Sequence, residues 1–155
     1  MTATGHAVIG LALAASIPNP WIGIPVAIVS HIAADAFPHW DTGTNIVKNN
    51  PKSKKTHLRF VVESFIDLGL SFILPYLLLL WLFPNLDLVY AYIMIIAAQG
   101  FDWASAPYVF LGFKFPPFTW PIAAQKSFDH RLDKPWGIIL QAAILILLLG
   151  IARFA

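Results

Sequence analysis

Five apolar segments, separated by proline or polar residues, constrain the fold of this chain more than any other feature of its sequence. They extend from Gly5 to Ile17, from Trp21 to Phe37, from Leu58 to Phe83, from Leu86 to about Ala104, and from Trp136 to Phe154. A helix needs roughly 20 mainly apolar residues to cross a bilayer. The pattern predicts an all-α integral membrane protein: an up-down bundle of about five transmembrane helices, the first one short, in a single domain over residues 1–155.

The composition agrees with a membrane protein and excludes several kinds of site. Hydrophobic residues make up 58% of the chain and charged residues only 12%, and the mean hydropathy is +0.70. In a soluble domain about 25% of residues are charged. The chain has no cysteine, which excludes a disulfide, a thiolate metal site and a cysteine nucleophile. The net charge of +2 comes from loops beside apolar segments, so the expected partners are membrane lipids and not nucleic acid.

Proline and capping residues predict where the helices begin and end. Asn19 is an expected N-cap, because Pro20 follows it at the first position of the second helix. Pro38 disfavours the helical conformation in the residue before it and should end that helix. Residues 105–134 are rich in proline and aromatic side chains and are expected to form a long connection.

The end of the second segment carries several groups able to bind a metal: His31, Asp35, His39 and Asp41. His31 and Asp35 are four residues apart and therefore share one face of a helix. His39 and Asp41 should follow on the turn beyond the helix, at the rim of the site. Ionisable groups at membrane depth are rare and point to function. The alternative is structural, with His31 and Asp35 paired inside the bundle and the other two residues at the interface.

Other segments bring ionisable residues to the same end of the predicted bundle. In an up-down arrangement, the starts of odd-numbered segments and the ends of even-numbered ones meet at one membrane face. The residues at this face are His6, Glu63, Asp67, Asp102 and His130. This convergence is the strongest argument in the sequence for one shared site, because it assumes no single motif.

The basic residues predict the orientation of the bundle. Nine of the ten lysine and arginine residues lie in or beside loops on the side of the candidate site, and only Arg153 lies on the other side. Loops rich in lysine and arginine remain in the cytoplasm. The chain is therefore expected in the cytoplasmic (inner) membrane, with its N-terminus and the candidate site facing the cytoplasm.

The candidate metal ligands are imidazoles and carboxylates: His6, His31, Asp35, His39, Asp67 and Asp102. This donor set suits a divalent ion, zinc first, with manganese or magnesium as alternatives. A bound cation would also allow neighbouring carboxylates to stay ionised near a region of low dielectric constant. Glu63 lies four residues after Arg59 and is expected to pair with it, which favours Asp67 over Glu63 as the ligand from that helix.

Two short motifs resemble those of a known family. Thr2-x-x-Gly5-His6 and Ser30-His31-x-x-x-Asp35 resemble segments of the bacterial inner-membrane metal-dependent hydrolases of the YdjM-like group. The resemblance covers about the first quarter of the chain, and it implies that the histidines and the aspartate of these motifs bind a metal. The segment after Pro38 matches the group's Pro-Asp-x-Asp-His element only loosely, and the group's His-Arg-x-x-Thr-His element is missing.

Together these features predict a membrane-embedded, metal-dependent hydrolase that acts on a phosphoester of a lipid or lipid-linked substrate. Glu63 or Asp41 is the expected general base, and Lys126, His130 and Arg131 are expected to hold the substrate phosphate. Two alternatives come from other classes: a non-catalytic accessory or scaffold subunit of a membrane complex, and a protein that binds or transports divalent cations. A homo-oligomer is compatible with each of these functions.

Overall fold

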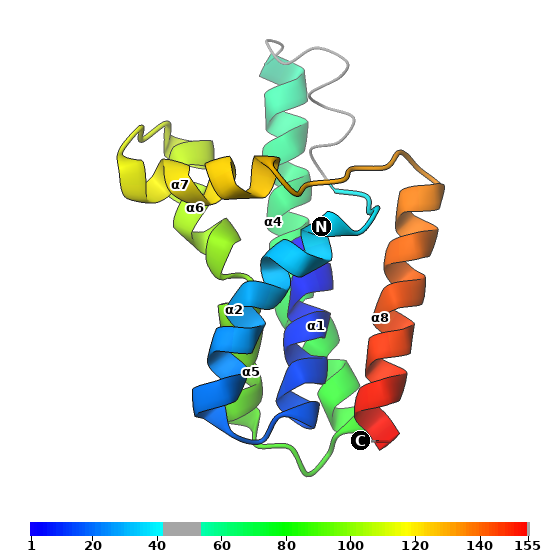
Figure 1. The fold of residues 1–155 in the computed structure, drawn as a ribbon. Helices are drawn as coiled ribbons and strands as arrows, with labels where there is room; N and C mark the ends of the chain where they lie inside the picture. The colour runs from blue at the N-terminus through cyan, green and yellow to red at the C-terminus, as the bar shows by residue number, and fades with distance from the viewer. Residues whose placement is uncertain (42–53, 155) are drawn as a thin grey trace.

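The computed structural model describes residues 1–41 and 54–154, and the regular elements in these residues are all helices (Figure 1). In chain order they are α1 (Ala3–Ser16), α2 (Pro20–Ala36), α4 (Lys54–Leu82), α5 (Leu88–Ala98), α6 (Gly100–Leu111), α7 (Pro116–Lys126) and α8 (Trp136–Phe154). The predicted all-α fold is confirmed. Two of the lysines used to predict the orientation, Lys48 and Lys52, lie outside the described residues.

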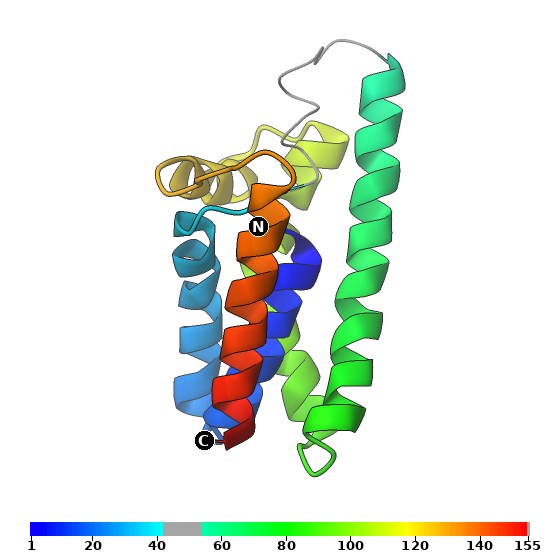
Figure 2. The same cartoon turned by 90° about the vertical axis from the view of Figure 1, so that its right-hand side faces the viewer.

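Helix α1 is the centre of the bundle, and α2, α4, α5 and α8 all pack around it (Figures 1 and 2). Leu11 of α1 is fully buried against Met94 and Ile95 of α5. The two helices approach so closely that a Cβ atom at Gly10 would lie 2.7 Å from the carbonyl oxygen of Met94. Glycine at this position therefore allows α1 and α5 to pack this closely.

The number of helices long enough to span a membrane is smaller than the sequence predicted. Leu58–Leu82 of α4 and Trp136–Phe154 of α8 are each long and apolar enough to cross a membrane. Helices α5 and α6 reach that length only together, as a pair bent by 52°. That gives two spans, or three with the bent pair, in place of about five. Helices α1 and α2 are shorter, and α1 is largely enclosed by protein, so its apolar residues form the core of the bundle.

The fourth predicted segment and the connection after it also differ from expectation. The helix breaks at Gln99 and continues as α6 to Leu111, and a further helix, α7, lies across the end of the bundle (Figure 1). Pro116 starts α7, where the missing N–H of proline costs nothing. The expected long connection thus contains ordered helical structure that places residues 125–131 over the end of α2.

The two ends of the bundle differ in chemistry. The start of α1, the end of α2 and the start of α8 lie at the same end as α6 and α7 (Figures 1 and 2). The opposite end holds the short connections that follow α1 and α4. There Asn19 accepts a hydrogen bond of 3.0 Å from the N–H of Trp21, which confirms the predicted N-cap of α2. The ionisable residues of the helices are therefore concentrated at the end that α7 covers.

Candidate metal centre

His31 and Asp35 occupy the last two turns of α2, and both are buried. Nδ1 of His31 lies 2.8 Å from the carbonyl oxygen of Ala98. A carbonyl only accepts hydrogen bonds, so Nδ1 carries the proton and donates it. In the neutral ring Nε2 is then a lone pair, and it lies 3.5 Å from Oδ2 of Asp35. This arrangement, with one ring nitrogen anchored and the other turned inward, is typical of a histidine that binds metal.

His6 comes from α1 and stacks on His31, with ring centroids 3.7 Å apart and planes inclined by 9°. Thr2 caps α1 by accepting a hydrogen bond from the N–H of Gly5, which sets the first turn that presents His6. Only 1% of His6 is exposed, and neither of its ring nitrogens finds a hydrogen-bond partner among the described residues. Its Nε2 lies 3.3 Å from Oδ1 of Asp35, so the ring nitrogen is positioned as a ligand.

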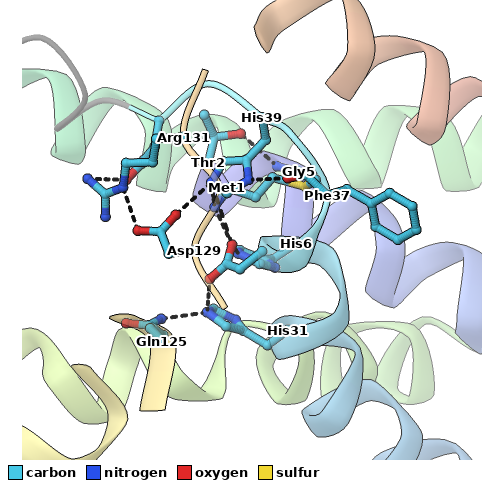
Figure 3. Close-up of polar contacts among 12 residues, drawn as sticks. Met1, Thr2, Gly5, His6, His31, Phe37, His39, Gln125, Asp129 and Arg131 are labelled. Atoms are coloured by element: carbon cyan, nitrogen blue, oxygen red, sulfur yellow. Dashed lines mark hydrogen bonds and ion pairs between the residues drawn. The ribbon is translucent and has the colours of Figure 1, made fainter. Parts of the chain in front are cut away.

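Asp102 reaches the same point from the first turn of α6. Its Oδ1 lies 3.7 Å from Nε2 of His31. Donor atoms of His6, His31 and Asp102 all lie within 4.8 Å of one another, close enough to hold one metal ion. We call these three residues the primary ligand group. Gln125 of α7 adds an amide that donates to Nε2 of His31 at 2.7 Å, which confirms that this nitrogen is an acceptor (Figure 3).

His39 is fully buried at the centre of the site and not at its rim, as the sequence had suggested. A short parallel pairing with the segment after α7 holds it: its N–H donates to the carbonyl of His130, and its carbonyl accepts from the N–H of Leu132. Its Nδ1 donates to the carbonyl of Phe37 at 2.8 Å, so the Nε2 lone pair again faces the carboxylates (Figure 3). The ammonium group of Met1 lies 2.7 Å from this Nε2 and forms an ion pair with Asp35.

Asp129 is a site residue that the sequence analysis missed. Its Oδ1 lies 3.3 Å from Nε2 of His39, and its Oδ2 accepts from Nε of Arg131 at 2.6 Å. Burial opposes ionisation of Asp129, but the charge of Arg131 and its hydrogen bond to Oδ2 favour the ionised form, and the pKa of the carboxyl is lowered. Burial also works against the charge of Arg131, while Asp41 and Asp129 together raise the pKa of the guanidinium. The carboxylate of Asp129 and the guanidinium of Arg131 therefore both stay ionised.

The remaining predicted site residues are divided between two places. Asp41 lies 3.4 Å from Arg131 and Lys126 lies at the end of α7, so both are near the centre. The side chain of His130 is exposed, and its Nδ1 donates to the carbonyl of Phe128. Glu63 accepts from Nε of Arg59 at 2.7 Å on the surface of α4, as the spacing predicted, which leaves Asp41 as the better candidate for a base.

Asp67, predicted as a metal ligand, makes structural hydrogen bonds to the start of α1. Its carboxylate accepts from the N–H groups of Ala3 and Thr4, at 2.7 and 3.1 Å, and from the Thr4 hydroxyl at 2.6 Å. The first N–H groups of a helix have no partner within the helix, and a negative charge stabilises that end. Asp67 of α4 thus caps α1 and holds the turn that carries His6.

An Asp67→Asn variant is expected to lose stability without losing metal. The amide accepts fewer hydrogen bonds and carries no charge, so the free energy of unfolding should fall by about 1 kcal/mol, as for loss of a helix cap. Thermal unfolding in detergent measures the first effect and elemental analysis measures bound metal. A fall in metal content like that of a His31 variant would instead identify Asp67 as a ligand.

A cavity of about 500 Å³ opens beside the primary ligand group, between α4, α6 and α7. Its wall includes charged and polar side chains, among them Asp41, Asp67, Asp102, Gln125, Lys126, Asp129 and Arg131. It also includes apolar side chains, among them Phe60, Phe65, Leu68, Ala106, Val109 and Phe110. The cavity therefore offers both charged and apolar contacts to a molecule bound in it.

The arrangement as a whole is a set of imidazole and carboxylate donors that faces a cavity with two cationic side chains. Such donors bind a divalent ion and activate water or an ester bound to it. The cationic side chains of Lys126 and Arg131 would complement a phosphate in the same cavity. Comparison of the chain with family models, with curated proteins and with solved structures finds no match.

Proposed function

We propose that this chain is an integral membrane hydrolase that depends on a divalent metal and cleaves a phosphoester of a lipid or lipid-linked substrate. The observation that carries the proposal is the convergence of His6, His31 and Asp102 beside a cavity lined by both charged and apolar side chains. A metal in the primary ligand group and an acyl or prenyl chain against the apolar side chains would place the ester bond next to the metal. The resemblance to the YdjM-like hydrolases supports the same proposal.

Zinc is the first choice of metal, with manganese or magnesium as alternatives, because the donors combine imidazole nitrogen with carboxylate oxygen. The donors fit a cation on physical grounds. Nε2 of His31 accepts from Gln125 and lies 3.5 and 3.7 Å from the carboxylates of Asp35 and Asp102, and Nε2 of His6 lacks a hydrogen-bond partner among the described residues. When bound, the metal would polarise the phosphoryl oxygen and favour deprotonation of water.

The surrounding side chains have distinct roles in the proposed reaction. Arg131 and Lys126 hold the phosphate, and Arg131 is itself positioned by Asp41 and Asp129. Asp41 accepts a proton from the attacking water as the bond between the water oxygen and phosphorus forms. The bond between phosphorus and the leaving oxygen breaks, and the leaving alcohol takes up a proton. The products are a phosphomonoester or phosphate and a free alcohol.

The membrane position follows from the two long apolar helices. We place α4 and α8 across the bilayer, with the bent pair of α5 and α6 as a third span. The polar end of the bundle then lies at the level of the lipid headgroups, where a lipid phosphoester is found. The excess of basic residues at this end supports a position on the cytoplasmic side of the inner membrane.

The test is turnover by detergent-purified protein before and after removal of metal. The substrates are long-chain phospholipids and the soluble diester bis-(p-nitrophenyl) phosphate. We expect hydrolysis that a chelator abolishes and that added zinc or manganese restores. Protein that carries metal but hydrolyses none of these esters would contradict the proposal.

One observation favours a second candidate function, that of a non-catalytic accessory subunit. The Met1 ammonium already neutralises Asp35, so the polar centre also has a metal-free ion pair that would hold α1 against α2. An accessory subunit would purify without metal, and its helices would unfold at the same temperature with and without a chelator.

A further inference from the structure

Three histidines approach the carboxylate of Asp35: His6 and His31, which belong to the primary ligand group, and His39, which does not. Oδ2 faces Nε2 of His31 at 3.5 Å. Oδ1 faces Nε2 of His6 at 3.3 Å and Nε2 of His39 at 3.8 Å, and this oxygen also holds the Met1 ammonium. His39 in turn lies 3.3 Å from Oδ1 of Asp129. The primary ligand group includes neither His39 nor Asp129, so these two donors lie beyond it.

We propose that Asp35 bridges two divalent cations. The first lies in the primary ligand group, and the second lies between His39 and Asp129. This inference rests on the proposed metal-dependent function and extends it: the hydrolase would work with a pair of metals, which can stabilise both the attacking and the leaving oxygen of a phosphoester.

The orientation of His39 is the first argument for the second cation. Its Nδ1 proton is committed to the carbonyl of Phe37, so in the neutral ring Nε2 is a lone pair that faces two carboxylates. Acceptors that face one another in a buried site are unfavourable unless a positive charge lies between them. The Met1 ammonium supplies such a charge in the structure, which shows that a cation is accommodated at this point. A metal ion would compete with the ammonium for the same donors.

The spacing of the donors is the second argument. Four ligands about 2.1 Å from a zinc ion in a tetrahedron lie about 3.4 Å from one another. The separations of Asp35 from His31 and His39, at 3.5 and 3.8 Å, are close to this value, as is the 3.3 Å between His39 and Asp129. Asp129 Oδ1 is also a buried atom without a hydrogen-bond donor among the described residues. These pairwise separations match those between two ligands of one metal ion.

The packing around His39 gives the donors of the proposed second site a rigid support. A Cβ atom at Gly137 would lie 2.5 Å from the carbonyl of Leu132 and 2.8 Å from the backbone nitrogen of Trp40. The start of α8 is therefore pressed against both strands of the short pairing that carries His39. Donors held in this way lose little conformational entropy when a cation binds.

The test is the number of metal ions bound per chain, measured by elemental analysis after the purified protein is saturated with zinc or manganese and desalted. We expect two ions in the unmodified chain, one in Asp129→Asn and in His39→Gln, and none in Asp35→Asn. Asp87→Asn makes the same chemical change at the far end of the bundle and should retain two. Thermal unfolding of each variant shows that it is folded, and the two single-site variants serve as checks on each other.

Electron paramagnetic resonance of the manganese-loaded protein gives an independent measurement, because two bridged manganese ions produce an exchange-coupled spectrum and an isolated ion does not. Saturation of the unmodified chain at one ion, or the spectrum of an isolated ion at full occupancy, would overturn the inference. Hydrolysis by a chain with one ion would leave the proposed function standing without the second metal. Two coupled ions without hydrolysis would support the second metal and contradict the proposed function.

Discussion

An Asp35→Asn variant is expected to lose its bound metal and to lower kcat/KM for a phosphoester by about 100-fold or more. Replacing a residue that only supports a ligand already costs about 10- to 100-fold in metal affinity or activity. Asp35 is more central than that, because its two oxygens face His6 and His31 at 3.3 and 3.5 Å and it is almost fully buried. Asparagine keeps the size of the side chain but removes the negative charge that a cation needs.

Asp87→Asn is the matched control for this variant. Asp87 caps α5 at the opposite end of the bundle by accepting from the N–H of Tyr90 at 2.7 Å, and asparagine caps helices about as well as aspartate. Metal content and activity should be unchanged in this variant. If Asp35→Asn retained both metal and turnover, the carboxylate would serve only to hold the Met1 ammonium.

An Ala106→Trp variant is expected to lower hydrolysis of long-chain substrates about 50-fold and to leave a soluble diester unaffected. Ala106 lines the cavity with Phe65 and Phe110, where the substrate chain is proposed to lie. Each buried methylene contributes about 0.8 kcal/mol, so excluding three of them would cost roughly 2.4 kcal/mol, or about 50-fold. The measurement compares kcat/KM for a long-chain phospholipid with that for bis-(p-nitrophenyl) phosphate.

Ala104→Trp provides the control, since Ala104 is exposed on the same helix and does not belong to the cavity wall. Its activity on both substrates should match that of the unmodified chain. An equal loss of both activities in Ala106→Trp would show that tryptophan disturbs the metal centre itself. No loss on the long-chain substrate would show that the apolar chain binds elsewhere.

Much of the fold could be predicted from the sequence because it depends on local signals. The start of α2 follows from Asn19 and Pro20, and the long apolar run from Trp136 to Phe154 matches α8 at both ends. Helices α6 and α7 were missed because Pro107 and Pro121 lie inside them, and proline in a helix reads as a break. The number of spans was overestimated, because an apolar helix enclosed by protein has the same composition as one that faces lipid.

The candidate site was predictable where it depends on helical spacing and not where it depends on tertiary contacts. His31 and Asp35 share a helix face, and the structure brings them together as expected. Asp129 was missed because only the pairing of its segment with His39 brings it into the site. Asp67 also has helical spacing in its favour, but the N–H groups of Ala3 and Thr4 at the start of α1 lie beside it and donate to its carboxylate.

X-ray absorption at the metal edge, on detergent-purified protein loaded with zinc, tests most directly whether this end of the bundle is a metal centre. Imidazole nitrogen binds zinc at about 2.0–2.1 Å and produces characteristic outer-shell scattering from the ring. We predict histidine ligands in the unmodified chain and a smaller imidazole contribution in His31→Gln, because Nε2 of His31 faces the cluster with its lone pair. A spectrum with oxygen ligands only, or one that His31→Gln leaves unchanged, would contradict the account.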